Sequence, residues 1–215
     1  MFKHLLKALS ISIVLLFGSS NTAVAGQAVS WNLYRDMMAG ITKNPTGVWS
    51  FMKNDMSDHN PVNYTLLPNY NKPTLWNGVI STDKSSFAWQ NATSTILIGI
   101  EGKNTSSLKN IPTLHPDFYS FAIIRWKSPI TGKVNISGRF SLLNESRVSG
   151  INWSIDNEST TIAQGSLNNL FEGNVFSLQN VTVKKGSSLY FIVDPQNFNP
   201  AYDATGLDLI ITSQQ

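Results

Sequence analysis

Carboxylates are the side chains of this 215-residue chain best suited to catalysis, because the other usual catalytic groups are missing. The chain has no cysteine, which excludes thiol nucleophiles, and no G-x-S-x-G segment of the serine-hydrolase kind. A glycosidase would need two carboxyl groups set across a cleft. Carboxylates in solvent-exposed turns are the more common alternative, since Asp favours turns. The candidates are Asp117, Asp156, Glu158, Glu172, Asp194, Asp203 and Asp208.

Two of these carboxylates, Asp203 and Asp208, suggest a site for a metal ion. They lie close together in the sequence near the last predicted strand, and carboxylate and carbonyl oxygens are the ligands that Ca²⁺ prefers. A structural calcium bound by Asp203 and Asp208 is therefore the candidate cofactor, although the chain has no acidic D-x-D-x-D loop. A transition-metal site is not expected, because His59 and His115 are the only histidines beyond residue 25 and neither has a second His at ligand spacing.

Aromatic residues in predicted loops are the candidates for ligand binding. The flat face of a Trp or Tyr ring can stack on the C–H side of a pyranose sugar, while its polar atom reaches water or a hydrogen-bond partner. Packing inside the protein is the alternative for each of these rings. For Trp49, Trp126 and Trp153, which lie within apolar strands, we expect a core position. The ligand-binding candidates are Trp76, Trp89, Tyr64, Tyr70 and Tyr202.

The stretch HPDFYSFAIIRWKSP, residues 115–129, predicts a central strand rather than an active site. It runs apolar over most of its length, which is typical of a strand covered on both sides. Alternate residues share a face, and both faces are largely apolar. One face carries Phe121, Ile123 and Arg125, and the other carries Ala122, Ile124 and Trp126.

We assign structural roles to Arg125, His115 and Trp126. A buried charge without a partner is very costly, so Arg125 should pair with a carboxylate from a later strand end, with Asp208 as the first expectation and Asp194 as the second. His115 precedes a proline and should shape the loop that leads into the strand, hydrogen-bonded to backbone. A catalytic role for His115 is not expected, because no partnered nucleophile is evident.

The remaining pattern predicts an all-β protein. The segment Lys133–Leu143 alternates apolar and polar residues with period two, and Gly150–Asp156 repeats that pattern. About ten such short segments follow one another at hairpin spacing, without crossover helices. Only Trp31–Ile41 has helical spacing. We therefore predict a jelly-roll-type antiparallel β-sandwich with a short N-terminal helical segment.

The N-terminus predicts export. Residues 1–25 combine a basic start, an apolar run and the A-x-A pattern at residues 23–25, which is typical of a cleaved signal peptide. An uncleaved anchor is the alternative, but the apolar run is shorter than the roughly 20 residues that span a bilayer. Residues 26–43 would then form an N-terminal extension with the helical segment, and residues 44–215 the sandwich domain. We expect a secreted or periplasmic protein without a membrane span after signal removal.

Composition excludes one class of partner and favours another. Two of the 16 Lys and Arg residues lie in the leader, which leaves 14 basic against 13 acidic residues, so no basic nucleic-acid footprint is present. Charged residues make up 13% of the chain, against about 25% in typical domains. Asn, Ser and Thr take their place, which suits a surface that contacts neutral polar ligands such as sugars.

Eight short segments of the chain carry a resemblance to a known family: Asn44–Ser50, His115-Pro116, Arg125-Trp126, Pro129–Gly132, Ile136–Phe140, Val183–Gly186, Phe191–Pro195 and Asp203–Asp208. In these segments the chain resembles exported bacterial modules, the galactose-binding-like and carbohydrate-binding-module sandwiches. The resemblance covers most of residues 44–212 and implies a β-sandwich, with a structural calcium near its terminal strands in many members. Asp117 stands where the usual pattern has Gly, so that turn is expected to differ.

Three functions remain open at this point. The sequence favours an exported, non-catalytic binding module for a carbohydrate or cell-surface polymer, because loop aromatics are present and catalytic motifs are missing. A structural or adhesive surface protein is the second alternative. A carboxylate-dependent polysaccharide hydrolase or lyase is the third, so an enzymatic role is the less favoured reading. The sequence leaves the ligand and the oligomeric state open.

Overall fold

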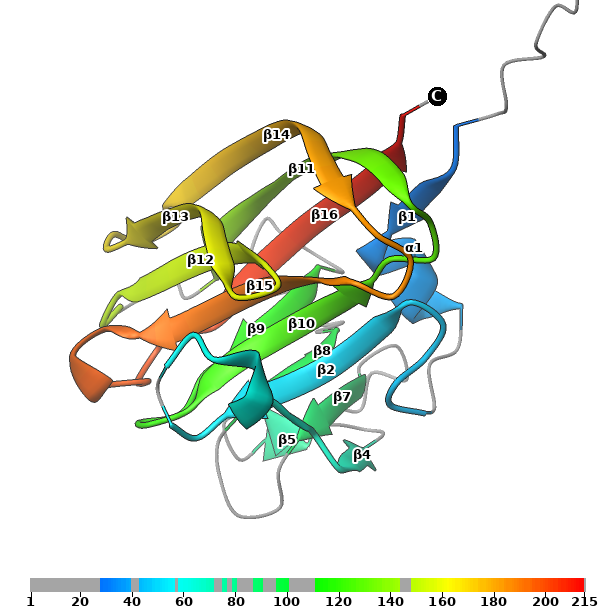
Figure 1. The fold of residues 1–215 in the computed structure, drawn as a ribbon. Helices are drawn as coiled ribbons and strands as arrows, with labels where there is room; N and C mark the ends of the chain where they lie inside the picture. The colour runs from blue at the N-terminus through cyan, green and yellow to red at the C-terminus, as the bar shows by residue number, and fades with distance from the viewer. Residues whose placement is uncertain are drawn as a thin grey trace, which may run out of the picture.

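Two antiparallel β-sheets face each other and form a sandwich (Figure 1), which confirms the predicted fold class. The computed structural model describes residues 28–39, 43–56, 58–71, 75–76, 79–80, 87–90, 96–100, 111–143 and 148–214, with the backbone alone for the segments between residues 69 and 90. The predicted signal peptide, residues 1–25, lies outside the described residues. No helix in the described ranges is long and apolar enough to cross a membrane.

The larger sheet has eight strands. Seven are hydrogen-bonded in the order β14-β11-β16-β9-β8-β7-β4, and β1 pairs with β16. Every pairing is antiparallel, as expected for strands joined by turns. The strands are β1 (Ser30–Asn32), β4 (Asn69–Asn71), β7 (Phe87–Gln90), β8 (Leu97–Ile100), β9 (Pro112–His115), β11 (Gly132–Leu142), β14 (Gly173–Val183) and β16 (Thr205–Ser213).

The second sheet has six strands in the order β13-β12-β15-β10-β2-β3, again antiparallel throughout. Strand β10 is hydrogen-bonded on both edges, so the predicted central strand is confirmed. A separate pair, β5 (Leu75–Trp76) and β6 (Val79–Ile80), forms a two-stranded sheet. The six strands are β2 (Trp49–Asn54), β3 (Thr65–Leu66), β10 (Phe121–Lys127), β12 (Ile151–Asn157), β13 (Thr160–Leu167) and β15 (Ser188–Pro195).

The main core lies between the two sheets and follows from the period-two alternation. On β11, Val134, Ile136, Phe140 and Leu142 are fully buried, as predicted from the alternating pattern. Trp153 of β12 stacks on Phe140 across the sandwich, with ring centroids 4.9 Å apart. The other predicted core tryptophans, Trp49 and Trp126, are also buried.

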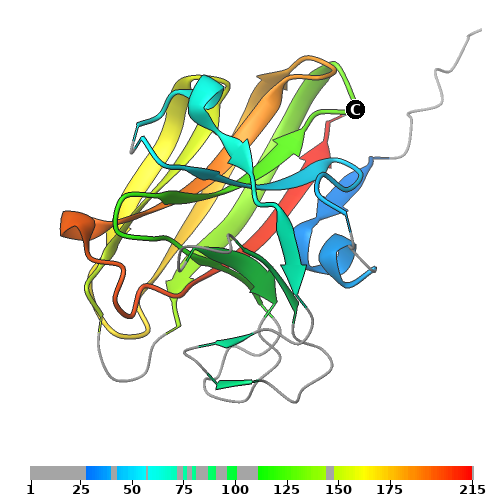
Figure 2. The same ribbon diagram turned by 90° about the horizontal axis from the view of Figure 1, so that it is seen from below.

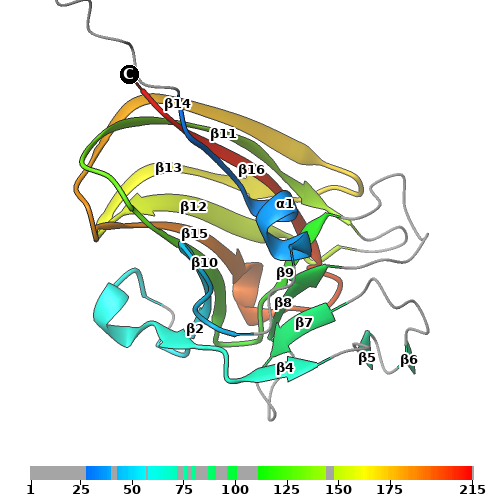
Figure 3. The ribbon, with the colours of Figure 1, turned by 90° about the vertical axis from the view of Figure 1, so that its right-hand side faces the viewer.

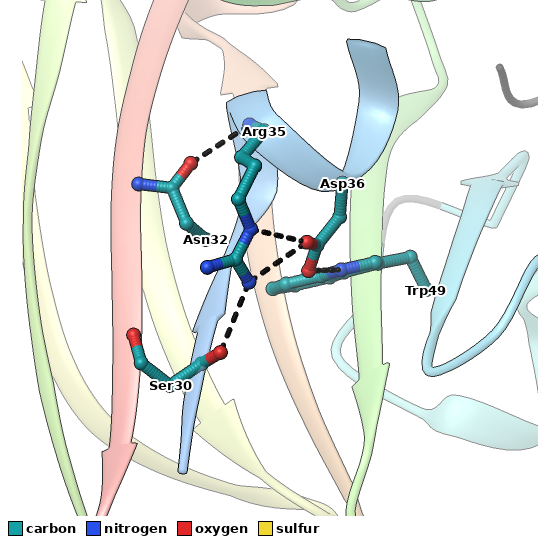
Figure 4. A network of polar contacts seen from close by, with 5 residues as sticks. All are labelled: Ser30, Asn32, Arg35, Asp36 and Trp49. Atoms are coloured by element: carbon teal, nitrogen blue, oxygen red, sulfur yellow. Dashed lines mark hydrogen bonds and ion pairs between the residues drawn. The ribbon is translucent and has the colours of Figure 1, made fainter. Parts of the chain in front are cut away.

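The N-terminal segment completes the sandwich beside β16 (Figures 2 and 3). Helix α1 (Leu33–Met38) is shorter than the predicted helical stretch, and the Asn32 side chain caps its start by accepting a hydrogen bond from the Arg35 backbone N–H. Leu33 and Met37 are fully buried. The carboxylate of Asp36 accepts a hydrogen bond from the indole N–H of Trp49 at 3.0 Å (Figure 4).

A second apolar cluster covers the outer face of the six-stranded sheet. The segment from Asp58 to Leu67, which includes the 3₁₀ turn η1 (Pro61–Asn63), lies over this face (Figure 3). Tyr64, which was predicted to lie in a loop as a ligand-binding candidate, is buried there. The cluster consists of Met52, Tyr64, Phe121, Ile123, Tyr190 and Ile192. It leaves the neighbouring part of the sheet, on β12 and β13, open.

Candidate functional site

Two adjoining hollows open on the outer face of the six-stranded sheet. Their volumes are about 290 and 230 Å³. Asn152 of β12 and Asp194 of β15 line both hollows and are register partners on neighbouring strands. We call the combined depression the groove. The first hollow is also lined by His59, Trp153, Ser154, Gln164, Gly165, Ser166 and Ile192, and the second by Phe118, Phe121, Pro195, Asn197 and Phe198.

The polar floor of the groove results from strand alternation. On β12, Ile151, Trp153 and Ile155 belong to the core between the sheets, so Asn152, Ser154 and Asp156 take the outer face. Strand β13 places Ser166 opposite Asn152 and Gln164 opposite Ser154. The Ser166 hydroxyl donates a hydrogen bond to Asn152 Oδ1 at 2.7 Å. The result is a ladder of uncharged hydrogen-bonding side chains.

Ser154 is the member of this ladder best placed to take a new partner. Its residue is 5% exposed, and its Oγ has no hydrogen-bond partner among the described residues although it lines the first hollow. A buried hydroxyl without a partner costs free energy, about 1–3 kcal/mol. A bound molecule or an ordered water in the hollow would supply the missing hydrogen bond.

His59, which lines the first hollow, forms an ion pair with Asp156. His59 Nδ1 lies 2.8 Å from Asp156 Oδ2, and the imidazole also packs against the ring of Phe121. The Asp156 side chain is 1% exposed, whereas that of His59 is 41% exposed. The hydrogen bond to Asp156 raises the pKa of His59. The pair anchors the segment that carries His59 to β12.

Two further carboxyl groups lie near the groove. Burial raises the pKa of Asp194, and the hydrogen bond that it accepts from Asn152 Nδ2 is long, at 3.5 Å. Burial also raises the pKa of Asp203 to about 7, helped by the charge of Asp194 and opposed by the Ser149 hydroxyl, which donates to Asp203 Oδ1 at 2.7 Å. Asp203 is fully buried and lines neither hollow, so Asp194 is the carboxylate that a ligand in the groove would meet.

Exposed aromatic rings border the second hollow. Phe118, Tyr119 and Phe198 are 52%, 67% and 58% exposed, and the rings of Tyr119 and Phe198 lie 5.6 Å apart. Asn197 and Phe198 both have the left-handed backbone conformation, with φ of 53° and 55°. This conformation is costly for a residue with a side chain and concentrates at ligand-binding segments. The loop at Asn197 and Phe198 therefore exposes the apolar ring of Phe198 to water through a backbone conformation that costs conformational energy.

The predicted aromatic ligand contacts have different outcomes. Tyr64 is 7% exposed and packs edge-on against Tyr190, so it presents no ring face to a ligand. Tyr202 is 44% exposed, in a left-handed turn with φ of 68°. The side chains of Trp76, Trp89 and Tyr70 lie outside the described part of the chain, which gives only their backbones in β5, β7 and β4. Their role in ligand binding stays a prediction.

Arg125 is not paired as predicted. Its Nη2 donates a hydrogen bond to the Ser50 hydroxyl at 2.7 Å, and its register partners are Ser50 and Tyr190. Asp208 lies on β16 of the other sheet, opposite Arg139, and Asp194 lies four residues along β15 from the partner of Arg125. The prediction was wrong because side-chain types do not reveal which strands become neighbours.

The other two structural assignments agree with the contacts. His115 Nδ1 lies 2.8 Å from the Pro116 carbonyl oxygen, as expected for a histidine that binds backbone, and burial lowers its pKa. Trp126 is fully buried and meets Trp31 edge-on, with ring centroids 5.1 Å apart. Both residues therefore support the sandwich and lie away from the groove lining.

The predicted calcium ligands are held in different surroundings. Asp203 is buried against Ser149, while Asp208 is exposed on β16. In the described ranges, no group of three or more His, Cys, Asp or Glu side chains could hold a metal ion. The described side chains thus do not supply the several acidic ligands that a protein calcium site usually has.

A catalytic pair of carboxylates was the third alternative, and the register bears on it. Asp156 pairs with Tyr190 and Asp194 pairs with Asn152, so the two acids sit four residues apart along adjacent strands. At about 3.3 Å per residue their backbones are roughly 13 Å apart. Glycosidase carboxyl groups are about 5 to 9.5 Å apart. The backbones of these two acids are thus farther apart than the two carboxyl groups of a glycosidase.

Sequence reasoning missed the groove itself. Asn152, Ser154 and Asp156 were identified only as the polar side of an alternating strand, and His59 only as a histidine without a second His at ligand spacing. Three hydrogen-bonding residues in succession on one face of an inner strand, N-x-S-x-D, were the available signal. That signal does not show that His59, far away in the sequence, pairs with Asp156.

No family model matches the chain, and no curated protein matches it. The chain is similar in structure to a CBM51 module from Clostridium perfringens in complex with methyl-galactose, covering 86% of this chain and 100% of that one at 10% identity and a TM-score of 0.42. It is also similar to a CBM36 module of a xylanase from the hindgut metagenome of Trinervitermes trinervoides, over 57% and 92% of the two chains at 11% identity and a TM-score of 0.36. A CBM36 module in complex with calcium and xylotriose matches over 56% and 94%, at 12% identity and a TM-score of 0.32. These three solved structures are carbohydrate-binding modules, and their likeness to this chain is one of fold alone.

Proposed function

We propose that the groove binds a carbohydrate without cleaving it. The observation that carries the proposal is the juxtaposition, in one depression, of a polar ladder and exposed aromatic rings. Asn152, Ser154 and Gln164 offer donors and acceptors at the floor. Phe118 and Phe198 offer apolar ring faces at the edge.

This combination suits a sugar because a pyranose has the same two-sided character. Its hydroxyl groups need hydrogen-bond partners, and its C–H face is apolar. Few precisely placed polar groups in a partly apolar depression are typical of a small-molecule site. The hydroxyl groups of a sugar also give up hydrogen bonds to water on binding. Amide and hydroxyl side chains can replace those bonds because they can both donate and accept.

The decisive ring variant is Phe198→Ala, with Phe171→Ala as its matched control. Both phenylalanines are more than half exposed and have left-handed backbone conformations, but Phe171 lines neither hollow. We expect Phe198→Ala to weaken binding of a glycan found on a broad array about tenfold, because a ring contact contributes about 1 kcal/mol or more. Phe171→Ala should bind as wild type does, by calorimetry.

The polar floor is tested with Ser154→Ala and Asn152→Ala. Each removes a hydrogen-bonding group from the first hollow, so each should reduce affinity by about fivefold to tenfold while circular dichroism stays unchanged. Absence of binding to every glycan in a broad panel would contradict the proposal. Equal loss of binding in the Phe198 and Phe171 variants would place the site elsewhere.

Export belongs to the proposal as well. The N-terminal pattern of residues 1–25 supports a secreted or periplasmic location, where a carbohydrate or a cell-surface polymer would be accessible. An adhesive role would use the same groove when the polymer belongs to a surface. N-terminal sequencing of protein from fractionated cells should find a mature chain beginning at Gly26, outside the cytoplasmic fraction.

A further inference from the structure

The groove has an unbalanced electrostatic character. His59 and Asp156 form an ion pair with each other, which leaves Asp194 as the acidic group in the floor shared by both hollows. Of the described residues that line the hollows, none is Lys or Arg. Asp203 lies behind the floor, close enough for the charge of Asp194 to raise its pKa. With the His59–Asp156 pair counted as neutral, Asp194 gives the described lining of the groove a net negative charge.

Asp194 itself is poorly satisfied. A carboxylate can accept about four hydrogen bonds, whereas among the described residues Asp194 accepts one, from Asn152 at the long distance of 3.5 Å. The side chain is partly buried, which raises its pKa, and the opposite charge of His59 offsets only part of that effect, so a further positive charge would stabilise the carboxylate. An ammonium group carries three donors and one positive charge, so it would supply both missing elements at once.

Two independent features beside Asp194 support a ligand at this position. Phe118 and Phe198 line the second hollow with it, and the face of an aromatic ring attracts a cation. The Ser154 hydroxyl, buried and without a partner among the described residues, lies in the first hollow on the other side of the shared floor. A sugar that spans the shared floor would contact three kinds of group: the carboxylate of Asp194, an aromatic ring of Phe118 or Phe198, and the hydroxyl of Ser154.

We propose that the groove selects carbohydrates that carry free ammonium groups, amino sugars that are not acetylated, and that Asp194 is the residue that determines this selectivity. The inference rests on the proposed function, because it names the class of sugar for the same groove. Anionic sugars such as uronates should be disfavoured by the same carboxylate. Neutral sugars should bind through the ring and hydroxyl contacts alone.

The test compares three β-1,4-linked oligomers of equal length, made of glucosamine, N-acetylglucosamine or glucose. They differ only at C2, which carries an ammonium, an acetamide or a hydroxyl group. By calorimetry at low salt we expect the glucosamine oligomer to bind about tenfold more tightly than the other two, since charge-assisted hydrogen bonds are the stronger ones. The difference should shrink as salt screens the charge.

The variant Asp194→Asn keeps the shape of the side chain and removes its charge. It should lose the preference for the glucosamine oligomer and keep the affinity for the neutral oligomers within about twofold, since an uncharged acceptor remains. Asp208→Asn, at an exposed carboxylate of the other sheet, is the matched control and should keep the preference. Thermal unfolding checks that both variants fold.

The outcomes separate the two proposals. Equal affinity of wild type for the three oligomers overturns the inference and leaves the proposed function standing. A preference for glucosamine that survives in Asp194→Asn overturns the role of Asp194. If none of the three oligomers binds while another neutral glycan on the array does, the selectivity is again overturned; if no glycan binds at all, both proposals fall.

Discussion

At the scale of single residues, the ion pair between His59 and Asp156 is the contact whose loss should most affect stability. Asp156 is almost completely buried, and its Oδ1 has no hydrogen-bond partner among the described residues. His59 is therefore the group that compensates this charge. Buried ion pairs are expensive to break on one side only, because the remaining charge is left in a poor environment.

We predict that His59→Ala lowers the free energy of unfolding by about 2–3 kcal/mol, less than the roughly 3–5 kcal/mol for a fully buried pair because the imidazole is partly exposed. The double variant His59→Ala with Asp156→Asn should recover part of this loss, since it removes the orphaned charge. Urea unfolding measures both. A single variant as stable as wild type would contradict the pairing.

The same pair gives a pH dependence with a defined sign. Asp156 raises the pKa of His59 in the folded protein above its ordinary value of about 6.5. A raised histidine pKa contributes stability that is fully present below the unfolded value and is lost as pH rises through the folded value. Asp203 also titrates near 7, so wild type must be compared with His59→Gln. We expect the stability difference between the two proteins to shrink as pH rises above about 6.5, and a constant difference would contradict the ion pair.

At the scale of elements, the close approach of β11 to its neighbours depends on Gly138. An added Cβ at this position would meet the backbone carbonyl oxygen of Asp208 on β16 and the ring of Phe176 on β14. Backbone atoms in the middle of a sheet cannot move aside cheaply. Gly173, at the start of β14, is a matched contrast, because its Cβ would meet the flexible guanidinium of Arg139.

We predict that Gly138→Ala lowers the free energy of unfolding by about 2–3 kcal/mol through overpacking, and that Gly173→Ala costs about 1 kcal/mol or less because Arg139 can turn outward. Chemical denaturation of the two variants measures the contrast. An equal loss in the free energy of unfolding for both variants would contradict this explanation, in which a rigid backbone neighbour makes the substitution more costly than a flexible side-chain neighbour does.

Sequence patterns predicted the long strands and their buried faces better than any other part of the fold. The alternation over Lys133–Leu143 identified β11 and its buried residues, and the alternation over Gly150–Asp156 identified β12. Each pattern is local, because neighbouring side chains on a strand point to opposite faces whatever the partner strand is. The segment Asp58–Leu67 carries no such alternation, so its packing over the outer face was missed.

At the scale of the whole molecule, the N-terminal segment is part of the sandwich. Strand β1 adds to β16, and α1 buries Leu33 and Met37 in the main core. The predicted division into an extension over residues 26–43 and a domain over residues 44–215 assigns this segment to the extension. Since its side chains fill the core, we expect the sandwich to depend on it.

The comparison of Leu33→Ala with Met38→Ala tests this dependence. Leu33 is fully buried and Met38 is 44% exposed, although both belong to α1. We predict that Leu33→Ala lowers the free energy of unfolding by about 3 kcal/mol, as expected for a leucine removed from a packed core. Met38→Ala should stay within about 0.5 kcal/mol of wild type. Equal stabilities of the two variants, measured by thermal and urea unfolding, would show that the sandwich core closes without the N-terminal segment.

The sequence by itself determined the β-sandwich class, the inner and outer faces of the long strands and the core positions of Trp49, Trp126 and Trp153. These follow from local periodicity and from the burial of large apolar side chains. It also pointed toward sugar-like ligands through composition, but it placed the candidate rings on other loops.

Only the tertiary structure decided where a ligand could bind. The groove gathers His59, Phe118, Asn152, Asp194 and Phe198, which are widely separated in the chain. Their proximity depends on the order and register of β12, β15 and β10, and these are set by contacts between distant segments rather than by local pattern. For the same reason the sequence could require a partner for Arg125 but could not identify Ser50, since period two tells which residues share a face and not which strand lies beside them.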